Sequence, residues 1–103
     1  MTGEIPPGFS SGADALALSP RDNVATVLRP VACGEEIIVH CAGQSSRLTA
    51  IQAIPFGHKI CLTPLGALDV VRKYGESIGH AVAAIAAGAH VHVHNMRGDR
   101  GQR

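Results

Sequence analysis

The chain has 103 residues, a length that fits a single domain with one modest hydrophobic core. Hydrophobic residues make up 46% of it and charged residues 17%, a balance typical of globular proteins that excludes disorder over most of the chain. The formal net charge of +1 does not provide the basic surface that nucleic-acid-binding domains need, and no apolar run is long enough for a membrane span. We therefore expect neither nucleic acid nor a membrane as a partner.

The cysteines point to a reducing compartment. They are odd in number, form no CxxC pair and each lies beside apolar residues, as small buried hydrophobes do: Cys33, Cys41 and Cys61. The N-terminus also lacks the basic and apolar regions of a signal peptide. These features together predict a cytoplasmic location.

The two ends of the chain differ in composition from the part between them. Residues 1–19 are rich in proline, glycine and serine and predict a flexible N-terminal arm. Residues 97–103 carry three arginines and predict a solvated basic tail. The ordered domain is therefore predicted to span residues 20–96.

The middle of the chain is predicted to form short β-strands. Residues 24–28 and 36–41 are rich in β-branched residues, which favours strands, and Pro30 ends the first of them. Further strands are predicted at residues 48–54, 60–62, 69–74 and 89–95. The alanine-rich residues 80–87 predict two turns of helix that end at Gly88.

The arrangement of these segments predicts the fold class. Short strands are separated by short loops with glycine or proline at most joints, and no internal repeat is evident. This pattern predicts a mainly β fold, a small barrel or clip with little helix, and excludes an alternating βαβ sheet.

Half of the six histidines alternate along one segment, at His90, His92 and His94. Alternate side chains of a strand share a face, so the three imidazoles would lie together, with Val91 and Val93 in the core behind them. Imidazole is a common transition-metal ligand and a proton carrier near neutral pH. The segment is therefore a candidate metal or proton-transfer site, and the alternative is a solvated strand edge. A complete metal site would need further ligands, with His40, His58, Glu35 and Glu76 as candidates.

Two other polar segments are candidate site residues. In Gly57-His58-Lys59, His58 could transfer a proton and Lys59 could pair with a carboxylate, although a polar surface turn explains the segment equally well. Near residue 74, Lys73 could form an anion clamp that Glu76 orients. The alternative for this segment is a solvated strand end.

Five segments taken in order resemble the SAF domain of the altronate and galactarate dehydratase family, over about residues 20–96. The combination of the Phe-Gly-His-Lys and His-Val-His-Asn blocks is the most specific part of the resemblance. The small subunit of sulfolactate sulfo-lyase is a close relative in the same family. The five segments are Asp22-Asn23-Val24-Ala25, Gly34-Glu35-Glu36, residues 54–60, residues 73–79 and residues 88–95.

The resemblance implies a β-clip fold and a subunit of a carbon–oxygen lyase. The reaction would be β-elimination of water from a polyhydroxy carboxylate, or of sulfite in the sulfolactate relative. It also implies a divalent metal, iron(II) or manganese, held mainly by a large catalytic subunit, so that this chain would be inactive alone. Two alternatives stay open, a non-catalytic sugar-acid-binding module and a small metal-binding protein. An oligomer of identical chains is a further partner that the sequence leaves open.

The resemblance also directs the choice of site residues. We expect catalytic roles for His58, His92 and His94, substrate binding by Lys59, Lys73 and Asn95, and metal binding by His92 and His94. Including Asn95 assumes that the histidine strand ends or bends before it, because strict alternation would aim its side chain away from the histidines. Ala89 stands where glutamate is usual and Ala84 where aspartate is common, and these losses weaken the case for metal binding by this chain alone.

Overall fold

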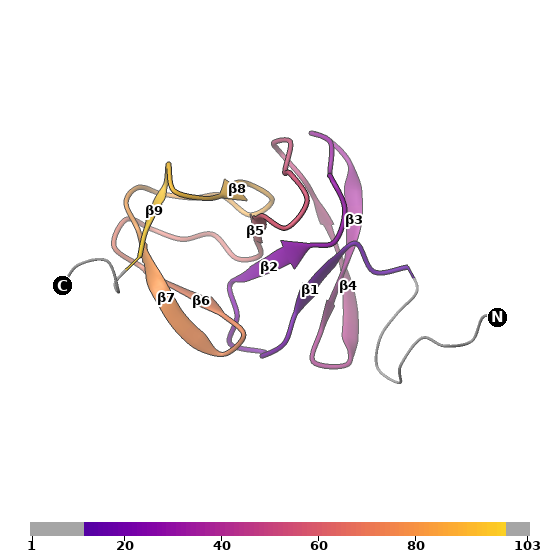
Figure 1. Ribbon diagram of the computed structural model, residues 1–103, viewed down its shortest axis with the longest axis horizontal. Coiled ribbons are helices and arrows are strands. Elements are labelled where there is room, and N and C mark those ends of the chain that lie inside the picture. The colour runs from indigo at the N-terminus through magenta and orange to yellow at the C-terminus, as the bar shows by residue number, and fades with distance from the viewer. Residues whose placement is uncertain (1–11, 99–103) are drawn as a thin grey trace.

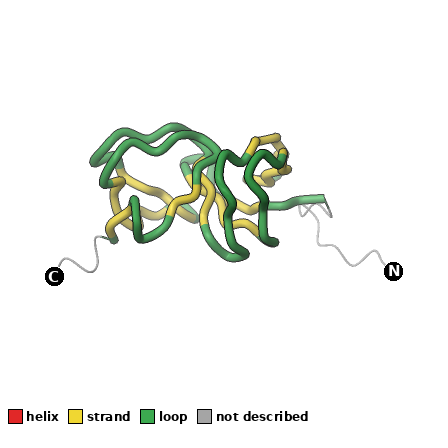
Figure 2. The backbone as a smooth tube through the Cα atoms, turned by 90° about the horizontal axis from the view of Figure 1, so that it is seen from above, coloured by secondary structure: helices red, strands yellow, loops and turns green. Residues whose placement is uncertain are grey.

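The computed structural model describes residues 12–98, so most of the predicted arm and tail lies outside the described residues. This part of the chain forms β-strands and contains no helix (Figures 1 and 2), which confirms the mainly β prediction and leaves no helix that could cross a membrane. The strands are β1 (Ala15–Ala17), β2 (Val24–Val27), β3 (Glu36–Cys41), β4 (Gln44–Thr49), β5 (Lys59–Cys61), β6 (Val70–Lys73), β7 (Glu76–Ala81), β8 (His90–Val91) and β9 (Met96–Arg97).

The strands form two sheets. The larger sheet has the order β4-β3-β1-β2-β5-β8 and the smaller sheet the order β6-β7-β9, and all pairs are antiparallel except β1 with β3. Figure 1 shows β3 and β4 at one end of the molecule, β6, β7 and β9 at the other, and β2 and β5 between them.

Alternation along β2 and β5 explains the two hydrophobic clusters of the core. Ala25 and Ile60, which pair directly, belong to one cluster, whereas their neighbours Val24 and Cys61 belong to the other. Successive side chains of a strand point to opposite faces, so this ladder has apolar residues on both faces. The ladder therefore joins the two halves of the molecule. β8, which contains His90, pairs with β5 and extends this ladder.

Three predictions about secondary structure are wrong. Residues 15–17 belong to β1, with Ala15 and Ala17 fully buried, so the predicted arm does not extend to residue 19. Residues 80–87 form no helix, because the chain continues in β7 to Ala81 and Ile85 then pairs with Leu65. Residues 44–49 form β4, so this strand begins and ends earlier than the strand predicted at residues 48–54. In each case backbone pairing decides a segment whose own propensity is weak or points elsewhere: with β2 and β3 for β1, with Leu65 for Ile85, and with β3 for β4.

One type of turn occurs four times within residues 12–98. It is an internal repeat of structure that the sequence did not predict. In each copy a buried residue forms an isolated bridge, the residue three positions later has a positive φ, and a strand begins two positions after that. The four turns share little sequence besides this spacing. Lys59 and His90 are equivalent first strand residues in two of them. The copies begin at Val31, Ile54, Leu65 and Ile85, and their positive-φ residues are Gly34, Gly57, Leu68 and Gly88.

Leu68 is the one non-glycine residue at these four positions, with a φ of 74° and 75% of its surface exposed. The left-handed conformation costs a residue with a Cβ about 1–2 kcal/mol, and this exposed side chain gives little burial in return. We expect Leu68→Gly to raise the free energy of unfolding by about 0.5–1 kcal/mol in urea denaturation, after the entropy cost of glycine. Leu68→Ala keeps the Cβ and is the control. A Leu68→Gly chain no more stable than Leu68→Ala would contradict this assignment.

Candidate functional site

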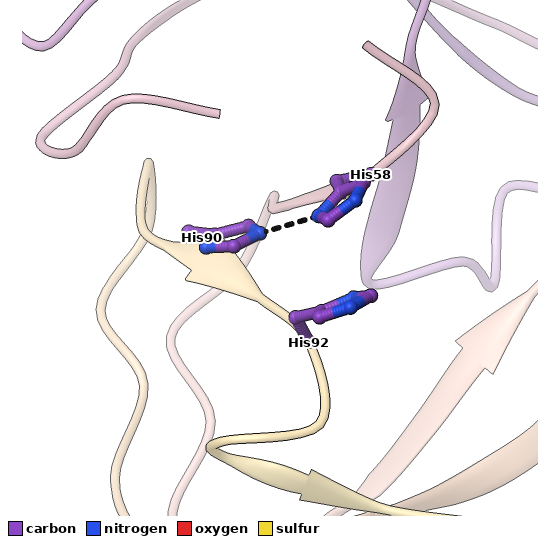
Figure 3. Close-up of side chains that lie close together, drawn as sticks. All are labelled: His58, His90 and His92. Carbon is purple, nitrogen blue, oxygen red and sulfur yellow. Dashed lines mark hydrogen bonds between the residues drawn. The ribbon is translucent and has the colours of Figure 1, made fainter. Parts of the chain in front are cut away.

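Cross-strand pairing of β5 and β8 brings three histidines together. Lys59 pairs with Val91 and Ile60 with His90, so continuing this register by one residue places His58 opposite His92. Ring nitrogens of His58, His90 and His92 all lie within 4.8 Å of one another (Figure 3). The cluster is therefore built from two of the four repeated turns, and not from the alternation of a single strand.

The three imidazoles, named here the histidine cluster, are half-buried and stacked. His58 Nδ1 lies 2.9 Å from His90 Nε2, so one nitrogen donates to the other and the pair shares a proton. The ring of His58 stacks on that of His92 with centroids 4.0 Å apart. The backbone N–H of His90 donates to Gln52 Oε1 at 2.8 Å, a positioning contact for which the sequence offers no signal.

The remaining part of the histidine run departs from the expected strand. β8 ends at Val91, which is fully buried as predicted, but Val93 is 79% exposed and does not belong to the core. His94 is exposed, and its ring centroid lies 5.1 Å from that of His90 at a tilt of 40°. The structure thus groups His92 with His58 and His90, whereas the predicted metal pair joined it to His94.

The chain leaves β8 after Val91 and bends before Asn95, as the predicted role of Asn95 required. Its side-chain amide is used within that bend: Oδ1 accepts from the N–H of His92 at 2.9 Å, and Nδ2 donates to the carbonyl of His90 at 2.8 Å. Asn95 therefore holds the histidines in place, and this leaves substrate binding by its side chain without support.

The surroundings of the cluster are cationic. Burial lowers the pKa of His90 and His92, and the charges of neighbouring histidines and of Lys59 lower both further. Burial also lowers the pKa of Lys59, with a smaller effect from the charge of Lys73. His90 and His92 are therefore neutral imidazoles at neutral pH, able to accept a proton or bind a metal ion.

Acidic side chains are missing from the cluster. Among residues 12–98 the one group of three or more potential metal ligands is the histidine cluster itself, so the candidate ligands His40, Glu35 and Glu76 do not join it. Glu35 instead pairs with Arg29 and accepts the N–H of Ala32. Lys73 lies opposite Glu76 in the β6–β7 hairpin, but the ion pairs of the described residues involve neither.

Comparison with known proteins was consistent with the motifs. The altronate/galactarate dehydratase SAF domain pattern matches residues 13–99. Altronate dehydratase of Escherichia coli is 45% identical over 76 residues, which cover 74% of this chain and 14% of that protein. Altronate dehydratase of Bacillus subtilis is 38% identical over 82 residues, which cover 80% of this chain and 16% of that protein. The chain thus spans about one seventh of the length of these relatives.

A second kind of relative is much shorter. Subunit alpha of (2R)-sulfolactate sulfo-lyase from Paracoccus pantotrophus is 50% identical over 54 residues, which cover 52% of this chain and 81% of that subunit. The match over residues 13–99 includes every residue of the histidine cluster and both candidate lysines. The chain therefore belongs to the family of altronate/galactarate dehydratase SAF domains.

Proposed function

We propose that this chain is the small, SAF-domain subunit of a hydro-lyase that removes water from a polyhydroxy carboxylate together with a large catalytic subunit. The histidine cluster beside Lys59 carries the proposal. It combines three groups able to transfer protons with a cation, Lys59, whose charge acts on His90 and His92 and which has no ion-pair partner within residues 12–98. The altronate dehydratases among the relatives support this reaction class.

Elimination of a hydroxyl β to a carboxylate makes three demands: a base for the α-proton, an acid for the leaving oxygen, and cations for the carboxylate. His92 is neutral and half-buried, which suits the base. The α-proton accepted by His92 makes it an imidazolium stacked on His58, and returning that proton to the leaving hydroxyl gives water; His94 at the exposed edge can exchange protons with solvent. Lys59 and Lys73 supply the positive charge for the carboxylate.

The histidine cluster also fits a divalent transition-metal ion. Two nitrogens bound at about 2.1 Å and at right angles to one ion lie about 3 Å apart, close to the 2.9 Å between His58 Nδ1 and His90 Nε2. His92 Nδ1 is buried without a hydrogen-bond partner among the described residues. Imidazole donors suit iron(II) better than manganese, which prefers carboxylates. With an ion bound, His58, His90 and His92 would contribute ligand nitrogens in place of the proton-transfer roles given above, and the ion would supply Lewis-acid assistance to the departing hydroxyl.

Two features limit metal binding by this chain alone. The lone pair of an imidazole nitrogen lies in the ring plane, so the stacked rings must turn before their lone pairs meet at one ion. The cluster also lacks a carboxylate. We therefore assign most of the metal ligands to the large subunit.

A second candidate function is that of the small subunit of a sulfolactate sulfo-lyase. It is favoured by the match to 81% of the alpha subunit from Paracoccus pantotrophus. In this reaction sulfite leaves in place of water, and the same base and cations serve. The two candidates differ in the released product, which can be measured directly.

The test is reconstitution with a large subunit, with release of 2-keto acid from aldonates and aldarates and of sulfite from sulfolactate as readouts. We expect activity from the pair only, and a loss of about 100-fold or more in kcat for His92→Ala, the usual effect of removing a general acid or base. His80→Ala, a histidine on β7 outside the cluster, is the matched control and should retain activity. Absence of both products from every pairing, or full activity of His92→Ala, would overturn the proposal.

A further inference from the structure

The single tyrosine of the chain lies in a group of polar side chains that includes Thr26 and Lys73 and extends to Lys59, the residue after His58. The hydroxyl of Tyr74 donates to Thr26 Oγ1 at 3.2 Å, and Thr26 pairs with Lys59 in the β2–β5 ladder. The ammonium of Lys73 lies over the Tyr74 ring, 5.0 Å from its centroid. The tip of the β6–β7 hairpin thus carries Lys73 and Tyr74 to the β2–β5 ladder of the larger sheet, where Thr26 pairs with Lys59.

The backbone of Tyr74 is strained. Its φ is 56° and that of Gly75 is 81°, as in the two-residue hairpin turns that favour asparagine at the first position. The N–H of Tyr74 donates to Asp22 Oδ2 at 2.9 Å, and that of Gly75 donates to Asp22 Oδ1 at 2.7 Å, which holds the turn in place. Because 40% of the tyrosine surface is exposed, core packing does not account for its use at a strained position.

Two lysines near the Tyr74 side chain, Lys59 and Lys73, form no ion pair among the described residues. Burial lowers the pKa of Lys59, and the charge of Lys73 lowers it further. The ion pairs found within residues 12–98 are made by Arg29 and Arg47, so neither lysine has a carboxylate partner there. Glu76 lies opposite Lys73 and the Asp22 carboxylate binds the turn, but neither acid forms an ion pair with a lysine in the described part of the chain. An anion bound between the two ammonium groups would reduce their repulsion.

We propose that Lys59, Lys73 and Tyr74 form an oxyanion subsite for the carboxylate or sulfonate group of the substrate, separate from the histidine cluster. Tyr74 positions Lys73 through its ring. Its hydroxyl donates to Thr26, which leaves the Thr26 hydroxyl proton to donate to an oxygen of the bound anion. That the bound anion is the substrate rests on the proposed function. The subsite itself rests on the contacts of Tyr74 with Thr26 and Lys73.

The chain has one tyrosine and no tryptophan, so its ultraviolet fluorescence reports on Tyr74 alone. We would titrate the metal-depleted full chain with D-altronate, a carboxylate, and with isethionate, a sulfonate without a carboxylate. The neutral polyol galactitol is the control ligand. A saturable emission change with either anion, which weakens as salt is added, and none with galactitol is the expected result. The anion that binds tighter identifies the head group, and no saturable change with either anion would overturn the subsite.

Variants then separate positioning from folding, with calorimetry measuring the affinity. We expect Lys59→Ala and Lys73→Ala each to weaken anion binding about tenfold, in line with the loss of one charged hydrogen bond. Tyr74→Phe keeps the ring and should lose less than Lys73→Ala. Tyr74→Asn suits the turn better, so it should raise the free energy of unfolding and yet weaken anion binding about as much as Lys73→Ala. Wild-type affinity in Tyr74→Asn would overturn the proposal.

Binding and turnover report separately on the two proposals. Anion binding by the isolated chain without turnover in any pairing would retain the subsite and reject the hydro-lyase function. Turnover that depends on His92 without anion binding by Lys59 and Lys73 would retain the function and reject the subsite.

Discussion

Gly88→Ala should destabilise the chain by about 4 kcal/mol, a large part of the 5–15 kcal/mol that stabilises a typical domain. Gly88 has a φ of 87°, and a Cβ built on it would lie 2.2 Å from the carbonyl oxygen of Thr49. The backbone has little room to relax, because the Gly88 N–H donates to the carbonyl oxygen of Cys61 at 2.8 Å. The Gly88 carbonyl accepts from the N–H of Ile51 at 2.9 Å. Urea denaturation measures the loss.

Two other glycines separate the causes of this loss. Gly34 has the same positive φ of 88° but open space around it, so Gly34→Ala should cost only the conformational strain, about 1–2 kcal/mol. Gly79 has no such φ, but its Cβ would lie 2.2 Å from the carbonyl of Arg97, so Gly79→Ala isolates the steric clash. If Gly88→Ala lowers the free energy of unfolding no more than Gly34→Ala does, the steric clash with Thr49 does not contribute and the prediction is contradicted. The close approach of Gly88 to Thr49 matters for the site because Gly88 precedes His90 by two residues.

Asp22→Ala should cost about 3 kcal/mol, because one carboxylate accepts four backbone N–H groups that would lose their partner. Asp22 is 8% exposed. Its donors are Leu18, Ser19, Tyr74 and Gly75, at 2.7–3.2 Å. These bonds join the loop after β1 to the β6–β7 turn and so help to connect the two sheets. Asp69→Ala loses only one exposed bond, to the N–H of Gly66, and is the control, with an expected cost below about 1 kcal/mol.

The Asp22 carboxylate should also make the stability of the fold sensitive to acid. Burial by itself would raise the pKa of Asp22, but the backbone hydrogen bonds together outweigh it and the pKa is lowered. A group with a lowered pKa stabilises the fold above its unfolded value of about 3.9, and this stability is lost as pH falls through the folded value. We expect the free energy of unfolding to fall below about pH 4, and to fall less steeply in Asp22→Asn. An Asp22→Asn chain as acid-sensitive as the wild type would contradict this origin.

The fold class could be predicted from local sequence because the strongest strands carry their own signal. The β-branched residues of β2 and β3 mark them as strands in any context. β1 has no such signal, since Ala15–Ala17 becomes a strand only by pairing with β2 on one side and β3 on the other. Residues 80–87 fail in the opposite direction, because the pairing of Ile85 with Leu65 overrides the helix propensity of alanine.

The residue types of the site can be predicted from the sequence, but their arrangement cannot. His58, His92 and Lys59 are candidates because imidazole and ammonium groups are rare and chemically capable, and the order of the motifs along the chain points to the family. The grouping of His58 with His90 and His92 could not be predicted, because it depends on the register between β5 and β8. Tyr74 was missed as a site residue because its contact with Thr26 joins two sheets.

The sequence by itself determined the mainly β class, the family and the histidine and lysine residues that can do chemistry, since these depend on side-chain identity and order along the chain. The tertiary structure alone decided which of those residues meet. A strand register places residues 32 positions apart, such as His58 and His90, in contact, and a bend closed by Asn95 turns His94 to the exposed edge. Such contacts are set by backbone pairing between distant segments, which local propensity and spacing do not encode.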